Sequence, residues 1–487
     1  MKQKIFLLIN FIIGINLNAQ NEIDALRYSQ DNIFGTAKFN SMSGSFGSLG
    51  GDFSVLSNNP AGIALYQNSE FSITPGLNYI ESKSNLQGNI NFSQQYGSLI
   101  SNLGVILVGD IIDDKWQRVN IGFGWNQTAS YNNSIYLNRN NENSSLADLF
   151  LEEADGLTID NLNSFGTSLA FWTDIIDLEN NLVDTSTNWY AFDNGNYISH
   201  VNPLSQKRQF ENINSYGDKG EFVISIGSSY EDNIYFGATI GFPLIYYSET
   251  STYTENNFID TTYNLREFNY TQNLTANGSG INLKFGSILR INHKTKIGVS
   301  INTPSYITME EDYSTRMNTL WSNGERISEE SPLGYFTYDI ITPWKISSSA
   351  STVINDKFLI NAEIEQIDYS FTHFISNNYS FIDENNIISS LYKKATNIKF
   401  GGELNLHPFK LRGGYAILES PFNDQNINNS ENYSAGLGID FGLSFFDVSY
   451  TINRSYSSYT MYSPENEASA NIRNEVHYLL FTLGVRY

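Results

Sequence analysis

The sequence predicts an all-β protein, a 14-stranded antiparallel transmembrane β-barrel with an N-terminal hatch, or plug, in its lumen. Three observations lead to this fold class. Segments with an apolar residue at every second position recur along the chain. Short turns and long loops alternate between these segments, and a stretch without alternation precedes the first of them. Strands that cross an outer membrane must close into a barrel, because lipid offers no partner for free backbone groups.

The composition fits a membrane barrel and argues against a nucleic-acid partner. Charged residues make up 16% of the 487 residues, whereas soluble proteins carry about 25%. The chain has 31 tyrosines and 32 phenylalanines, which suit the aromatic girdles of such barrels. A formal net charge of -23 without a basic stripe disfavours binding to phosphate backbones. The chain has no cysteine, which excludes disulfides, thiolate metal sites and a lipid-anchored cysteine.

Residues 1–19 predict a signal peptide. Two lysines precede an apolar run over residues 5–15, and the small residue Ala19 offers a cleavage site. The run is too short to cross a bilayer as a helix, and no later stretch approaches the roughly 18 apolar residues that such a helix needs. We therefore expect export to the cell outer membrane of a Gram-negative-type bacterium, with strands as the crossing elements.

The hatch is predicted for residues 20–69. This segment does not alternate, and it is rich in Gly, Ser and small apolar residues, as in "GSFGSLGGDFSVLSNNPAG". A barrel of 14 strands encloses a lumen wider than its own side chains can fill, so water passes unless something plugs it. Residues 20–69 are tethered to the first strand, so this segment is the natural plug.

The barrel is predicted for residues 70–487. In the hairpin "EFVISIGSSYEDNIYFGATIGF", a tight turn joins two alternating strands, with Ile240 expected to face lipid and Thr239 the lumen. The chain ends on a similar strand, "VHYLLFTLGVRY". The expected strands lie at 70–82, 99–109, 117–128, 221–230, 234–248, 279–291, 296–308, 344–354, 357–370, 396–406, 411–419, 432–442, 445–456 and 474–487. A soluble β-sandwich also alternates, but short turns all at one end favour the barrel.

The longest loop is expected at about 129–220, where "SLADLFLEEADGL" predicts a short amphipathic helix. Carboxylates are expected to gather in the long loops. A solvated outer surface explains them, and divalent cations that bridge the loops to lipopolysaccharide are the alternative, although no ligand spacing defines a site. The acids concerned are Glu152, Glu153, Asp155, Glu310, Glu311, Asp312, Glu329 and Glu330.

Several motifs together resemble a known family. Asn59, Pro60 and Ala61 follow a small-residue segment directly before the first strand, and "LRGGYAILESPF" lies near the end of the barrel. In this order they are similar to the FadL/TodX (OmpP1) family of outer-membrane transporters. The resemblance implies uptake of hydrophobic small molecules, such as long-chain fatty acids or hydrocarbons, by binding, hatch movement and lateral release. The terminal Tyr487 resembles the signal that the barrel assembly machinery reads.

The candidate site residues lie in the hatch and in the third strand. The ligand pocket is expected to use apolar hatch side chains, unless these only pack the plug: Phe46, Leu49, Phe53, Val55 and Leu56. Gly122 and Gly124 are candidates for a kink that opens the wall, although glycine facing a crowded lumen is the commoner reason for such residues.

No cofactor and no enzymatic activity are expected. The five histidines are scattered, which suggests neither a metal site nor a catalytic triad; they are His200, His293, His373, His407 and His477. Two rival functions remain for a barrel similar to this family. One is a surface attachment or shuttle component of protein secretion, and the other is a haem receptor.

Overall fold

The structure is a computed structural model, and it describes most of the chain. The predicted signal peptide, and the turn expected near residues 113–114, lie outside the described residues. The described ranges are 22–110, 115–179, 196–424, 427–462 and 468–487.

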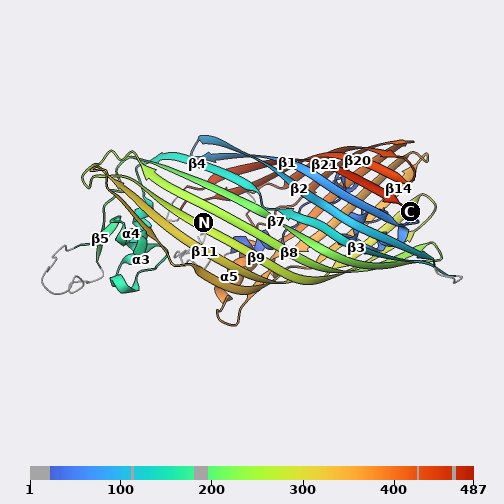
Figure 1. The fold of residues 1–487 in the computed structure, drawn as a ribbon, viewed down its shortest axis with the longest axis horizontal. Helices are drawn as coiled ribbons and strands as arrows, with labels where there is room; N and C mark the ends of the chain where they lie inside the picture. The colour runs from blue at the N-terminus through green and yellow to red at the C-terminus, as the bar shows by residue number, and fades with distance from the viewer. Residues whose placement is uncertain (1–21, 111–114, 180–195, 425–426, 463–467) are drawn as a thin grey trace, which may run out of the picture.

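The wall is one antiparallel sheet that closes on itself (Figure 1). Within the described ranges, nineteen strand segments form 14 barrel strands, because several barrel strands are interrupted and then continue. The segments, in the order of the 14 barrel strands, are β1 (Glu70–Leu86), β2 (Asn89–Asp110), β3 (Trp116–Ser130) with β4 (Asn133–Asn141), β7 (Lys207–Tyr230), β8 (Ile234–Asn256), β9 (Leu265–Arg290), β10 (Thr295–Asn302) with β11 (Tyr306–Trp321), β12 (Arg326–Glu330) and β13 (Gly334–Ile341) with β14 (Lys345–Ile354), β15 (Phe358–Asp368) with β16 (His373–Ile375), β17 (Lys394–Leu406), β18 (Phe409–Leu418), β19 (Ser430–Asp440), β20 (Ser444–Tyr459) and β21 (Ala470–Arg486).

The barrel closes between its first and last strands. β1 pairs antiparallel with β21, from Glu70 opposite Arg486 to Asn85 opposite Asn471. This pairing leaves no free sheet edge at the closure, as a strand in lipid requires. The predicted 14-stranded antiparallel barrel is confirmed.

The predicted facing of the strands is also found. Ile240 is 42% exposed on the outside of β8, whereas its neighbour Thr239 is 1% exposed in the interior. Apolar side chains likewise point outward along the last strand, at Leu483 and Val485. These rows form the band that meets the acyl chains of the bilayer.

Several strands are longer than the sequence predicted. β2 begins at Asn89 rather than residue 99, β7 at Lys207 rather than 221, and β9 at Leu265 rather than 279. The added outer parts of β7 and β9 carry mostly polar residues on their outward face, so they lack the outward apolar row that marks a membrane-facing strand. The added part of β2 does expose Ile90, Phe92 and Tyr96, but polar residues lie between them. The loop expected at 129–220 is correspondingly shorter, because β4 and the start of β7 lie within it.

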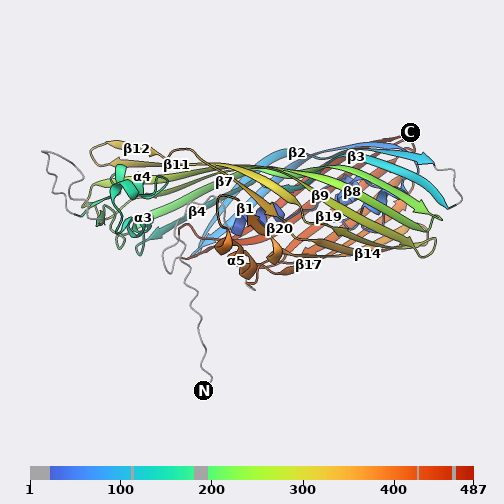
Figure 2. The ribbon, with the colours of Figure 1, turned by 90° about the horizontal axis from the view of Figure 1, so that it is seen from below.

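The wall is therefore much taller on one side. β7, β8 and β9 have 24, 23 and 26 residues, whereas β18 and β19 have 10 and 11. At about 3.3 Å per residue, the tall strands are some 80 Å long and the short ones about 33 Å. Figure 2 shows the tall strands projecting beyond the rest of the barrel at the end opposite the C-terminus.

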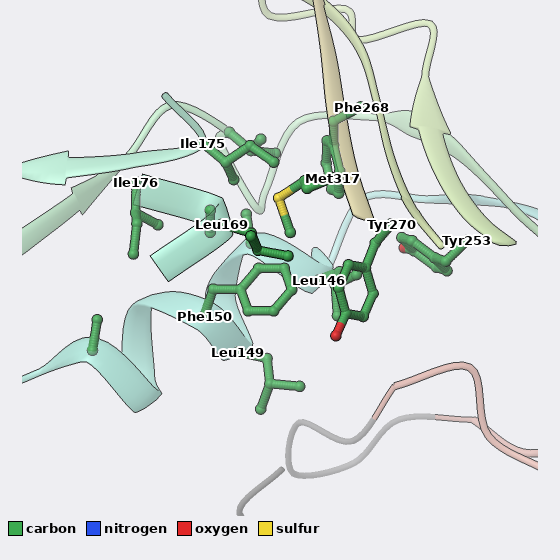
Figure 3. Close-up of a cluster of buried hydrophobic side chains, with 14 of the residues drawn as sticks. Leu146, Leu149, Phe150, Leu169, Ile175, Ile176, Tyr253, Phe268, Tyr270 and Met317 are labelled. Atoms are coloured by element: carbon green, nitrogen blue, oxygen red, sulfur yellow. The ribbon is translucent and has the colours of Figure 1, made fainter. Parts of the chain in front are cut away.

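A small cap covers the inner face of this tall wall near its end. It comprises α3 (Leu146–Ala154), η3 (Ile159–Asn161), α4 (Thr167–Trp172) and the hairpin of β5 (Ile176–Leu178) and β6 (Tyr197–Ser199). α3 is the predicted amphipathic helix, and it begins with a capping box in which Asp148 accepts from the backbone of Ser145. Figure 3 shows Phe150 and Leu169 pointing toward Tyr270 and Met317 of the wall.

The low side of the rim is covered by α5 (Ile382–Leu391) and η4 (Tyr369–Phe371). α5 packs in a second buried cluster that includes Ala25 and Tyr28 of the N-terminal segment. None of the helices in the described ranges is both long and apolar enough to cross a bilayer.

The acids predicted for loops lie partly in strands. Glu310, Glu311 and Asp312 belong to β11, and Glu329 and Glu330 to β12. Glu311 is fully buried and accepts a hydrogen bond from the hydroxyl of Tyr338 at 2.6 Å. The expectation of a solvated or cation-bridging carboxylate is therefore wrong for Glu311.

Candidate functional site

The hatch consists of four short helical turns inside the barrel: α1 (Glu22–Ser29), α2 (Ala37–Asn40), η1 (Phe53–Ser57) and η2 (Pro60–Leu65). Each of the last three begins at a residue whose side-chain oxygen accepts a backbone N–H. Thr36 accepts from Phe39, Asp52 from Ser54 and Asn59 from Ala61, at 3.0 to 3.1 Å. These caps stabilise turns that are too short to persist alone.

The Asn-Pro-Ala motif holds the hatch to itself and lies against the wall. The Asn59 amide donates to the carbonyl of Gly47 at 2.6 Å, while its oxygen caps η2. Gly237 of β8 and Gly286 of β9 face the motif, and an added Cβ at either would overlap Pro60 or Asn59. The two glycines are paired with each other, so together they form the flat patch of wall on which the motif rests.

A buried carboxylate binds the turn that precedes η1. Glu363 of β15 accepts the backbone N–H groups of Phe46 at 3.2 Å and Gly47 at 2.8 Å, and the amide of Asn58 at 3.2 Å. Lys399 of β17 lies 3.2 Å from the same carboxylate and neutralises it. This set of charge-assisted bonds fixes the hatch to the low side of the barrel.

A second ionic contact fixes the start of the hatch. Asp31 lies between Lys219 of β7, at 2.7 Å, and Lys345 of β14, at 2.6 Å. Burial by itself raises the pKa of Asp31, but the two ammonium groups outweigh this and hold the pKa well below its ordinary value. Asp31 is therefore a carboxylate at every physiological pH.

Two cavities of about 70 Å³ each meet at this ion pair. Both are lined by Asp31, Ser57, Thr128 and Lys345. Polar and apolar groups contribute about equally to their walls, in contrast to the apolar pocket that the sequence suggested.

The five predicted pocket residues line neither of these cavities. Phe46, Phe53, Val55 and Leu56 are at most 1% exposed, and Leu49 packs against them at the edge of the same cluster. Their partners in the cluster include Ile106 and Val223 of the wall. In this conformation these side chains form the core of the plug, which was the alternative interpretation of the sequence.

The third barrel strand is interrupted, but not at the predicted glycines. Gly122 and Gly124 are regularly paired with β2 and β7, and an added Cβ at either would contact the hatch residues Leu56 or Phe53. The register of β3 against β7 shifts elsewhere, between Trp116 and Arg118 and between Gln127 and Ala129. The two glycines have a packing role in this conformation, which was the alternative interpretation of the sequence.

At this interruption the wall has a gap in its backbone pairing, which, among the described residues, only side-chain hydrogen bonds to β4 cross further out. β2 pairs with β3 only as far as Asn102 opposite Asn126. Beyond this point residues 89–101 of β2 pair with β1 alone, and β4 pairs with β7 alone. The amide of Asn102 donates to Asn126 at 2.6 Å, and Asn126 donates to Ser57 of the hatch at 2.7 Å.

Hatch residues 32–35 bridge the two sides of this gap. On one side, the N–H of Asn32 donates to the carbonyl of Thr128 at 2.7 Å. On the other side, Gly35 exchanges two hydrogen bonds with the hydroxyl of Ser101, at 3.0 and 2.7 Å. Phe34, between them, packs edge-on against Tyr478 with ring centroids 5.0 Å apart.

Sequence reasoning missed most of this arrangement. The charges at Lys345, Glu363 and Lys399 lie at inward positions of predicted strands, and a buried charge on a lumen-facing position is a signal that could have identified them. Nothing in the sequence marks residues 32–35 as the bridge. In the described part of the chain, no group of three or more acids and histidines is arranged to hold a metal ion.

Comparisons with known proteins agree with this architecture. The family model described as "Outer membrane protein transport protein (OMPP1/FadL/TodX)" matches residues 34–441. No curated protein matches the sequence.

Solved structures share the fold at low sequence identity. A Pseudomonas aeruginosa FadL homologue is 11% identical, with a TM-score of 0.55, and the alignment covers 94% of this chain and 99% of that one. The Pseudomonas putida toluene transporter TodX is also 11% identical, with a TM-score of 0.51 and the same coverage.

Proposed function

Because the chain belongs to the outer-membrane transport family OMPP1/FadL/TodX, we propose that it takes up small hydrophobic molecules across the outer membrane, with lateral release through the wall beside β3. The family assignment, over residues 34–441, supports the transport role.

The observation that carries the proposed route is the bridge at residues 32–35. A hydrophobic molecule gains little from a water-filled channel, whereas a side exit delivers it directly to lipid. At about 0.8 kcal/mol per buried methylene, an acyl chain of some sixteen carbons favours an apolar environment by on the order of 10 kcal/mol. Within the described residues, β2 lacks backbone pairing on its β3 side only along this gap. Asn32 and Gly35 bridge its inner end, and the hydroxyls of Ser82, Ser84 and Ser93 donate across its outer part to residues of β4.

We propose that the preferred ligand carries a carboxylate, as a long-chain fatty acid does. Lys219 and Lys345 hold the Asp31 carboxylate between them, at the meeting point of the two cavities. An incoming carboxylate has the same charge and geometry, so it competes with Asp31 for these lysines. Displacing Asp31 frees the segment directly before residues 32–35, which couples ligand binding to hatch movement.

A cross-link between the hatch and the β3 side of the gap tests the route. The chain has no cysteine, so Asn32→Cys with Thr128→Cys introduces one isolated pair at a site of direct backbone contact. We expect uptake of a radiolabelled fatty acid by cells to stop when the pair is oxidised and to return on reduction. The single variants serve as controls, and uptake that continues through the oxidised form refutes lateral release at this gap.

Competition between substrates tests the ligand class. Excess toluene should leave fatty-acid uptake unchanged if a carboxylate is recognised, whereas equal competition by toluene points to a hydrocarbon channel. If wild-type cells take up neither the fatty acid nor toluene, and secreted proteins bind to the purified barrel, the secretion-shuttle alternative is supported instead.

A further inference from the structure

The outward face of the tall wall changes from apolar to polar along the strands. On β8, the outward residues Ile240 and Leu244 belong to the apolar band. At its upper edge Tyr246 lies beside Tyr216 of β7, with ring centroids 6.1 Å apart. Beyond these tyrosines most outward positions are hydroxyls and amides, interspersed with the ring of Phe210 and with charged residues of both signs, such as Arg208 and Asp312. We call this area the outer polar face; it comprises Asn212 and Asn214 of β7, Thr250 and Thr252 of β8, Asn269, Thr271 and Asn273 of β9, and Ser314, Arg316 and Asn318 of β11.

The side chains of the outer polar face are held by hydrogen bonds that run from strand to strand. Thr250 donates to Asn273 at 2.9 Å, and Thr252 and Thr271 lie 3.2 Å apart. Asn318 donates to Asn269 at 2.8 Å, on the next pair of strands. Groups fixed in this way bind a ligand without a large loss of side-chain entropy.

The outer polar face also contains a pocket. Residues 331–333 leave the sheet between β12 and β13, and beside them opens a cavity of about 260 Å³. Its lining includes Thr271, Asn273, Ser314, Ser331 and the ion pair of Arg316 with Glu330. The cavity therefore offers hydroxyl, amide and charged groups, and little apolar surface for an acyl chain.

We propose that the outer polar face binds the saccharide headgroup of an outer-leaflet glycolipid. Dense hydroxyls and amides, with one balanced ion pair, complement the hydroxyl groups of sugars as both donors and acceptors. The position favours a membrane glycolipid as the source. The same strands carry the lipid-facing band directly below, so a glycolipid whose chains lie against Ile240 and Leu244 places its sugars on this face.

The experiment compares glycolipids that share a lipid and differ in sugar. The purified full chain in detergent is titrated with lipopolysaccharide that has a complete core oligosaccharide, and with lipopolysaccharide truncated to its innermost sugars. We expect the complete form to bind about tenfold more tightly, which corresponds to one or two net hydrogen bonds. Asn273→Ala combined with Arg316→Ala should abolish this preference, since both side chains are outward and their loss leaves the barrel folded.

Asn471→Ala provides the matched control. Asn471 is an exposed asparagine on β21, outside the outer polar face, and its variant should keep the wild-type preference. Two results would overturn the proposal: equal binding of both glycolipids by the wild type, or an unchanged preference in the double variant. Binding of the lipid-free core oligosaccharide as tightly as the intact glycolipid would overturn the assignment to a membrane source.

Discussion

Replacing Asp31 by asparagine is expected to open the hatch. The substitution removes the one carboxylate that Lys219 and Lys345 share, and keeps the size of the side chain. Breaking a buried ion pair by removing one partner costs about 3–5 kcal/mol. The Asp31 side chain is 31% exposed, while the lysines are 7% and 18% exposed, so we take the lower end, about 3 kcal/mol.

If the seated hatch loses about 3 kcal/mol of stabilisation, the equilibrium between the seated and the displaced hatch shifts roughly 100-fold toward the displaced form. The assay is the conductance of single barrels in planar bilayers, together with leakage of a small sugar from proteoliposomes. Asp312→Asn removes the same charge from the outward face of β11, away from the hatch, and should conduct as the wild type. If the Asp31→Asn barrel conducts and leaks no more than the wild type, the ion pairs of Asp31 with Lys219 and Lys345 do not hold the hatch in place.

The same contact predicts how leakage depends on pH. The folded-state pKa of Asp31 is lowered, so its stabilisation is fully present above its ordinary pKa, near 4, and is lost only as pH falls through the lowered value. Wild-type leakage should therefore not change between about pH 8 and pH 5. A rise in leakage within that window would mean that a group other than Asp31 controls the hatch.

Three further substitutions test other parts of the structure. Gly286→Ala places a methyl group against Asn59 and should unseat the hatch and raise leakage, whereas Gly413→Ala, whose added Cβ meets nothing closer than 3.8 Å, should not. Ile240→Lys should disfavour membrane insertion by about 2–4 kcal/mol, measured by urea titration in vesicles, while Thr252→Lys on the same outward face above the apolar band should cost little; equal costs would contradict the assigned membrane position. Phe150→Ala should destabilise the cap by about 3–5 kcal/mol, so that limited proteolysis cuts residues 142–206 while the barrel remains folded, and collapse of the barrel would show that the cap is no separate unit.

The lipid-facing part of the fold could be predicted from the sequence. Rows such as Phe222, Ile224 and Ile226, each more than half exposed, are apolar because they meet acyl chains, and their inward neighbours are small or polar. That contrast shows where the strand lies and which of its faces meets lipid. The turn after Tyr230 then fixes the register with the next strand.

The outer halves of the tall strands could not be predicted in this way. Above the bilayer the outward face meets water, so residues such as Thr252 and Asn273 are polar, and apolar residues such as Phe268 point inward and are buried under the cap. The outward apolar row that marks a lipid-facing strand is therefore missing. The strand is then defined only by its pairing with neighbours, which a single sequence does not reveal. The loop expected at 129–220 was too long for the same reason.

The candidate site was predicted only in outline. The Asn-Pro-Ala motif marked the hatch, but its contacts join residues far apart in the chain, such as Gly47 with Glu363, which lie 316 positions apart. The role of a lumen-facing charge depends on which hatch atom lies opposite it. Burial of Phe53 and Leu56 followed from their apolar character, whereas their place in the plug core rather than in a cavity depends on the wall glycines beside them.

The closure between β1 and β21 constrains the order in which the molecule is assembled. The hatch is joined to the last strand, since the N–H of Ala37 donates to Thr482 at 2.7 Å, and to β19, since the N–H of Ser43 donates to Ser434 at 3.0 Å. The plug therefore reaches its final position only after the whole polypeptide has been exported. While the sheet is still an open ribbon, the plug can lie on the concave side, and zipping the first strand to the last encloses it. The pairing of β1 with β21 that closes the barrel is thus also the step that leaves its lumen plugged against water.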